Sequence, residues 1–208
     1  MNNMDNRRDE FLLRMYDQMF NNIDRHILVV WQSVSVLIGA FALFALSEKN
    51  IIPIDIACTL IVMIATWLIA HVFDASHWYN RNLNIIANIE REFLNKEDSK
   101  LIHFYFARHI KPNDIITQLK IQRMLGIYVI ILVFLYHLLT RIIPKLGKVI
   151  DLFNDISAKG INGLKGYSFS IVIPYIFIII CLFYLNRIKN DRLKSLEDFE
   201  KKSPGKKL

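Results

Sequence analysis

The sequence lacks the residue patterns on which most enzyme and redox sites depend. Only two of its 208 residues are cysteines, and Cys58 and Cys181 both lie in apolar stretches, where we expect no structural disulfide. No Walker A loop, Gly-x-Ser-x-Gly elbow or His-Glu-x-x-His pair occurs in the chain. The sequence therefore offers no catalytic residues and no cofactor site, and we expect that the protein is not an enzyme.

Charge is nearly missing from four long apolar stretches, in a chain whose residues are 53% hydrophobic. Each stretch is close to the ~20 residues with which a helix crosses the ~30 Å hydrocarbon core of a bilayer. We therefore predict an all-α membrane protein with four helical spans and helical cytoplasmic extensions. The predicted spans are Ile27–Leu46, Ile56–Phe73, Leu125–Ile143 and Ser168–Asn186.

The positive charges predict how the spans are oriented. Twenty of the 26 Lys and Arg residues lie in the N-terminal segment, the middle segment and the C-terminal tail, and six lie in the two remaining loops. Because Lys and Arg are enriched in cytoplasmic loops, both termini and the middle segment are expected in the cytoplasm.

These expectations divide the chain into five parts. Apolar residues recur at helical spacing before the first span, which predicts an amphipathic helix there. The parts are a cytoplasmic amphipathic helix (1–26), a first transmembrane hairpin (27–73), a cytoplasmic helical cap (74–124), a second hairpin with an external loop (125–186, loop 144–167) and a basic cytoplasmic tail (187–208).

Three potential metal ligands follow one another where the second predicted span ends. His71, Asp74 and His77 share one helix face at spacings of three residues, which fits a zinc site or a proton relay. The same residues fit a polar helix end at the level of the lipid headgroups. No Cys or Glu completes a recognisable motif, and we therefore expect no metal.

A line of small and polar residues runs through the first predicted span. Gln32, Ser35 and Gly39 fall on one helical face, where they could line a pore or let a second helix approach closely. Four spans are few for a pore within one subunit. A conducting path would need a ring of subunits around a symmetry axis, and we expect a homo-oligomer of about four.

The stretch Leu101–Asp114 concentrates aromatic and basic side chains between the second and third spans. Aromatic rings can stack on bases, and the basic side chains can bind phosphate or the acidic residues of a partner. The trigger would then be a nucleotide, a short oligonucleotide or a partner protein; alternatively, the aromatic residues only pack the cap. The candidate ligand-binding residues are Tyr105, Arg108, His109 and Lys111.

The order of these elements resembles that of small bacterial anti-phage membrane effectors. The stretches "FLLRMYDQMFNNIDRHILVVWQSVSVLIGAFAL" and "HWYNRNLNIIANIEREFL" are similar to the SLATT-type pattern of an amphipathic helix, a two-span hairpin and a second amphipathic helix. The second hairpin resembles the four-span subunits of the Kiwa and Hailong defence systems. This resemblance implies an oligomer of the bacterial inner membrane that forms a gated channel or pore and depolarises the membrane when a cytoplasmic signal arrives. A non-conducting anchor that recruits a soluble partner is the alternative.

Overall fold

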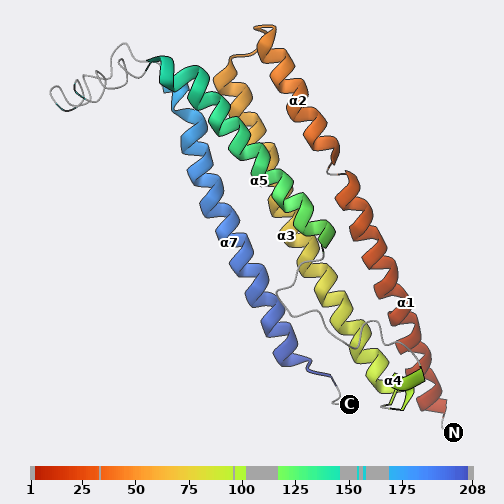
Figure 1. Ribbon diagram of the computed structural model, residues 1–208. Coiled ribbons are helices and arrows are strands. Elements are labelled where there is room, and N and C mark those ends of the chain that lie inside the picture. Colours follow the sequence, from red (N-terminus) through yellow and green to blue (C-terminus); the bar gives the residue numbers. More distant parts are fainter. Residues whose placement is uncertain are drawn as a thin grey trace. The chain divides into compact units, whose positions relative to one another are not determined.

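The computed structural model describes residues 3–32, 34–95, 97–101, 117–145, 154, 157 and 169–205, and every regular element in them is helical (Figure 1). The predicted all-α class is therefore confirmed for this part of the chain. The five long helices are α1 (Asn3–Gln32), α2 (Val34–Glu48), α3 (Ile54–Phe93), α5 (Thr117–His137) and α7 (Ile173–Lys202). The short elements are α4 (Asp98–Leu101), the π-helix η1 (Leu138–Ile142) and the 3-10 helices η2 (Ile143–Lys145) and η4 (Phe169–Ile171).

Three of the described helical stretches are long and apolar enough to cross a membrane. They are Ile54–Phe93, Leu119–Ile142 and Ile173–Lys202, and they indicate a membrane protein. The predicted first span falls on α1, described to Gln32, and on α2, described from Val34, and Ser33 between them lies outside the described residues. With 15 residues, α2 is roughly 22 Å long, which is shorter than the ~30 Å apolar core of a bilayer. Among the described residues there are thus three such helices and not the predicted four, because α2 by itself is too short to span.

The chain forms two compact units. We call Met1–Ser33, Ala70–Lys120 and Arg187–Leu208 the terminal unit, and Val34–Ile69 with Ile121–Asn186 the apolar unit. Helix α1 belongs to the terminal unit and α2 to the apolar unit, whereas α3, α5 and α7 each contribute residues to both.

Helix α3 provides the centre of the apolar unit. In its most apolar stretch 56% of the residues are buried, against 17% and 11% in the corresponding stretches of the α5–η1 and α7 helices. The outer faces of α5 and α7 instead expose large apolar side chains, such as Leu132 and Phe183. A soluble domain rarely exposes so large an apolar surface, so these faces suit contact with lipid. The core cluster contains Ala40, Cys58, Ile61, Val62, Val133 and Cys181.

In the terminal unit, α1 and α7 both pack on the second half of α3. Tyr16, Met19, Phe20 and Ile23 of α1 form a cluster with Leu83 and Ile86 of α3, which explains the helical spacing of apolar residues near the N-terminus. On the α7 side, Arg81 lies over the rings of Trp78 and Phe199, at 5.1 and 5.5 Å from their centroids. Asn84 donates a 3.0 Å hydrogen bond to Glu200.

At Gly126, α5 lies close to α3 in the apolar unit. A Cβ atom at this position would lie 2.7 Å from Cγ1 of Ile69 and 3.5 Å from the carbonyl oxygen of Ala65. A methyl group here would therefore collide with the Ile69 side chain, and glycine is favoured, as expected where small residues let two helices pack closely. At Gly39, by contrast, a Cβ would meet no atom within 4 Å.

We expect Gly126→Ala to destabilise the protein by about 1–3 kcal/mol, because the buried Ile69 side chain must move. Gly39→Ala is the matched control and should be neutral or stabilising by about 0.5–1 kcal/mol, since alanine favours a helix over glycine. Thermal unfolding in detergent measures both. The effect of Gly126→Ala should shrink in an Ile69→Ala background, and equal effects in both backgrounds would contradict the contact.

Candidate functional site

A buried carboxylate lies in the first turn of α3. The carbonyl oxygen of Pro53 accepts hydrogen bonds from the N–H groups of Ile56 and Ala57, both at 3.0 Å, and this fixes the start of the helix. An acidic residue in a first helical turn suits the positive end of the helix dipole and is usually in water. Asp55 is only 1% exposed instead, and its side chain points into the apolar unit.

Three side chains from outside α3 donate hydrogen bonds to this carboxylate. Nε2 of His137 and Nε of Arg141 both lie 3.0 Å from Oδ1 of Asp55. Nη2 of Arg141 lies 3.4 Å and Oγ of Ser170 2.7 Å from Oδ2. Because His137 ends α5, Arg141 lies in η1 and Ser170 in η4, one carboxylate joins α3 to three other elements.

The backbone is irregular where these donors meet. Residues Leu138–Ile142 form a π-helix, in which the N–H of Ile143 donates to the carbonyl oxygen of Leu138. Short π segments inside helices are rare and occur often at functional sites. Here the segment lies directly after His137 and contains Arg141, so the irregular turn carries a donor to the buried carboxylate.

His137 is held at both ring nitrogens. While Nε2 faces Asp55, Nδ1 lies 2.9 Å from the hydroxyl of Tyr175, and the two rings meet edge to face with centroids 5.3 Å apart. In the neutral ring Nε2 donates to the carboxylate, and Nδ1 accepts from the Tyr175 hydroxyl. The ring is only 1% exposed, so its orientation is fixed by these two bonds. We call Asp55, His137, Arg141, Ser170 and Tyr175 the Asp55 cluster.

The chemistry of the Asp55 cluster fits charge pairing better than catalysis. A serine hydrolase needs a histidine nitrogen to accept the proton of the serine, whereas the Ser170 hydroxyl donates to the carboxylate. Both nitrogens of His137 are already engaged. In a membrane-spanning unit, a paired and buried charge of this kind is costly and usually serves a function. Its simplest use is to hold α3, α5 and η4 in one arrangement.

The predicted pore-lining residues are divided between two helices. Gln32 is the last residue of α1, whereas Ser35 and Gly39 lie in α2, where Ser35 is exposed and Gly39 half-buried. Their role as a pore wall stays a prediction. The predicted ligand-binding residues Tyr105, Arg108, His109 and Lys111 all fall outside the residues that the structure describes.

The candidate metal ligands near the middle of α3 contact α7 of the terminal unit. Oδ1 of Asp74 pairs with Nη2 of Arg192 at 2.6 Å, and Nδ1 of His77 lies 3.2 Å from the carbonyl oxygen of the same arginine. Among the described residues, no group of three or more His, Cys, Asp or Glu side chains is placed to hold a metal ion. In this structure Asp74 and His77 therefore bind α7, and their place at the level of the lipid headgroups stays a prediction.

Asp55 is the residue that the sequence did not reveal. Two residues after Pro53, it has the expected place of an ordinary first-turn acid. One pattern pointed toward it: His137 and Arg141 are four residues apart, so they share a helical face at the end of an apolar stretch. Two such groups at membrane depth require an acidic partner, and Asp55 is an acid at the start of another span.

We expect Asp55→Asn to destabilise the apolar unit by about 3 kcal/mol, because it leaves Arg141 without its charge partner. Tyr175→Phe removes only the hydroxyl facing His137 and should cost about 1 kcal/mol. Thermal unfolding of the purified variants shows which of the two substitutions destabilises the protein more. If Tyr175→Phe were the more damaging variant, the carboxylate would not be the centre of the cluster.

A second partly buried carboxylate lies in the part of α3 that belongs to the terminal unit. The hydroxyl of Tyr16 donates a 3.3 Å hydrogen bond to Oε1 of Glu90, while Oε2 is buried and accepts no hydrogen bond from the described residues. Burial raises the pKa of the Glu90 carboxyl above its ordinary value, although the bond from Tyr16 opposes the rise. Burial and the nearby charge of Glu90 also raise the pKa of the Tyr16 hydroxyl.

This shift predicts how the contact between α1 and α3 depends on pH. Because the folded pKa of Glu90 is raised, its contribution to stability is complete below the ordinary pKa of a glutamate and is lost as the pH rises through the folded pKa. Glu90→Gln should therefore be more stable than the parent at neutral pH, and this advantage should vanish in acid. Unfolding temperatures of the parent and of Glu90→Gln, measured from acid to neutral pH, test this expectation. Glu92→Gln, at a nearby exposed carboxylate, is the control, and an equal gain there would contradict the role of burial.

Comparison of the chain with protein-family models, with curated proteins and with solved structures found no match. Arguments about function therefore depend on the chain's own geometry. In the described residues, that geometry points to the Asp55 cluster of the apolar unit.

Proposed function

We propose that the chain is an oligomeric membrane effector that conducts ions through a gate and depolarises a bacterial inner membrane when a cytoplasmic signal is sensed. The observation that carries this proposal is the Asp55 cluster. Its carboxylate and guanidinium lie in a unit whose helices otherwise present apolar residues. The Asp55 side chain is 1% exposed and that of Arg141 33%. Apolar side chains of similar size would often be as stable as an ion pair with so buried a carboxylate, and we infer a switching role for this pair.

The proposed gate is a change in helix packing around this carboxylate. While Arg141 and His137 bind Asp55, the cluster acts as a latch that favours the closed arrangement. An input that weakens the latch would shift the population toward a second, open packing. Helices α3, α5 and α7 contribute residues to both units, so a displacement in the terminal unit can act on the spans directly.

An oligomer is part of the proposal because one subunit has few helices to enclose a path. Large side chains fill the centre of the apolar unit, where Ile61, Val62 and Val133 are almost fully buried. A water-filled path would then form between subunits, most simply on the axis of a closed ring of about four copies. Ser35 and Gly39 of α2, with Gln32 before them, are the proposed lining of that path.

The input is assigned to the segment that separates α3 and α5 in the sequence. Tyr105 would stack on a base, and Arg108, His109 and Lys111 would bind phosphate or the acidic side chains of a partner. The anti-phage role follows from the resemblance in the order of helices and hairpins, and a nucleotide, a short oligonucleotide or a partner protein would be the signal.

The alternative is a membrane anchor that recruits a soluble partner and conducts nothing. A charged face of α7 favours it, because acidic and basic side chains alternate there around Phe199. The face consists of Asp191, Lys194, Ser195, Asp198, Phe199 and Lys202. A partner with a mixed-charge surface would fit such a face.

We expect Arg141→Gln to raise the basal ion conductance several-fold, because the latch loses its strongest donor while Asp55 keeps His137 and Ser170. Arg187→Gln is the matched control: Arg187 lies on an exposed part of α7, in a weak pair with Asp191, and should leave conductance unchanged. The measurement is ion flux through liposomes that contain each purified protein, together with membrane potential after induced expression.

Mass photometry of the same preparations reports the number of subunits. A monodisperse monomer that passes no ions in any variant would exclude the channel and leave the anchor. An oligomer whose conductance is equal in the parent and Arg141→Gln would retain a channel but exclude the Asp55 cluster as its latch.

A further inference from the structure

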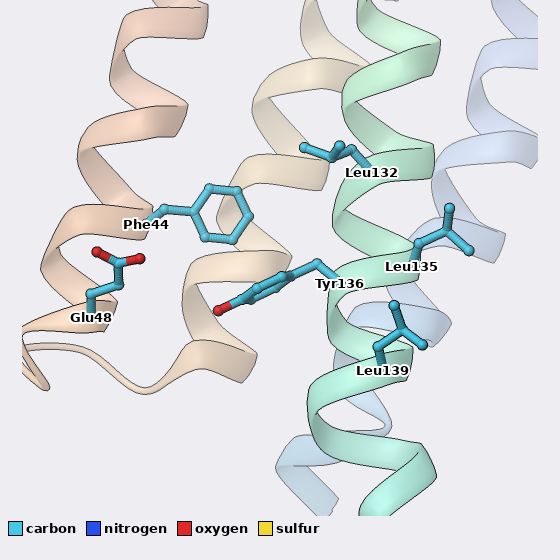
Figure 2. A pocket seen from close by; sticks show the side chains of 6 residues that line it. All are labelled: Phe44, Glu48, Leu132, Leu135, Tyr136 and Leu139. Carbon is cyan, nitrogen blue, oxygen red and sulfur yellow. The ribbon is translucent and has the colours of Figure 1, made fainter.

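A groove separates α2 from α5 on the outer side of the apolar unit. Its volume is about 450 Å³. Figure 2 shows its lining, in which α2 supplies Phe44 and Glu48, α5 supplies three side chains and η1 supplies Leu139. The lining residues are Phe44, Glu48, Leu132, Leu135, Tyr136 and Leu139.

The groove is apolar along its length and polar at one end. Leu132, Leu135 and Leu139 form a stripe that follows the helix for roughly 10 Å. Phe44 and Tyr136 meet edge to face across the groove, with ring centroids 5.4 Å apart. The hydroxyl of Tyr136 points toward α2, on the side where the carboxylate of Glu48 lies (Figure 2).

The polar end coincides with the end of an apolar helix. Glu48 is the last residue of α2, and the chain then turns at Asn50, whose φ of 56° is in the left-handed region. The three leucines are between 47% and 60% exposed, so the groove opens outward. Around membrane-spanning helices the surroundings are lipid, and an exposed acid at a helix end belongs at the level of the headgroups. An acyl chain therefore suits the leucine stripe, and a headgroup suits the end that holds Glu48.

The charge at the Glu48 end of the groove determines which lipid headgroup fits there. A carboxylate beside two aromatic rings attracts a cation, because the faces of the rings are electron-rich. A primary ammonium can also donate hydrogen bonds to the carboxylate, which a choline group cannot do. Glu48 repels an anionic headgroup, although the exposed Lys49 that follows it in the chain reduces this repulsion.

We propose that this groove binds an aminophospholipid of the phosphatidylethanolamine type. Its ammonium group contacts Glu48 and Tyr136, and one acyl chain lies along Leu139, Leu135 and Leu132. The inference rests on insertion of the apolar unit in a membrane and does not require conduction, so it can hold if the channel proposal fails. Lipid bound here would fill the space between α2 and α5.

Native mass spectrometry of the delipidated, refilled protein tests the proposal. The probes are phosphatidylethanolamine, phosphatidylcholine and phosphatidylglycerol with identical acyl chains. We expect the parent to retain phosphatidylethanolamine at least roughly fivefold better than the other two, and Glu48→Gln to lose this preference. Leu135→Trp, which fills the groove, should reduce retention of all three lipids. Glu197→Gln, at an exposed carboxylate of the terminal unit, is the control and should bind like the parent.

Two results would overturn the proposal. Equal retention of the three lipids by the parent and by Glu48→Gln would show that the groove has no headgroup preference. Efficient disulfide cross-linking between copies that carry Leu135→Cys, in place of lipid retention, would show that the groove is covered by a second copy of the chain. Circular dichroism of each variant confirms that its helices have formed.

Discussion

The Asp55 carboxylate is the constraint on which the arrangement of the apolar unit depends. Moving a carboxylate out of water costs several kcal/mol even after the protein relaxes, and only close donors can offset that cost. His137, Arg141 and Ser170 provide them at 2.7–3.4 Å, each from an element other than α3. A helix that moved away from α3 would leave a charge or a polar group unpaired, so the ends of these helices are held together electrostatically.

In the rest of the apolar unit, the helices pack in an arrangement that is compatible with the contacts of Asp55. Helix α3 is buried between its neighbours, and Gly126 lets α5 approach it so closely that a methyl group would collide with Ile69. Apolar contacts between membrane helices give little preference for one arrangement, because lipid is as apolar as the side chains. A charged cluster at one end supplies that preference. Where the cluster weakens, a second packing becomes accessible, and this is the physical basis of the proposed gate.

The sequence predicted the helical class and three of the long apolar helices, because helix length and hydrophobicity are local properties. It also predicted a fourth span, Ile27–Leu46, whereas three helices of the described residues are long and apolar enough to cross a membrane. It also missed the Asp55 cluster, in which the donors to Asp55 lie 82 to 115 residues from it in the sequence and meet it only in the fold. The spacing of His137 and Arg141 indicated that an acidic partner was needed, yet periodicity alone could not identify it. The contact of Tyr16 with Glu90 could not be predicted either, because the two residues are 74 positions apart in the sequence.

A double-mutant cycle between Asp55 and Arg141 tests the central claim most directly. The free energy of unfolding in bicelles would be measured for the parent, Asp55→Asn, Arg141→Gln and the double variant. If the carboxylate holds the helices through this pair, the two substitutions should be coupled by about 1.5–3 kcal/mol, as for a hydrogen bond between charged groups. Effects that add within about 0.5 kcal/mol would contradict the account, because the pair would then contribute nothing of its own to the arrangement of the helices.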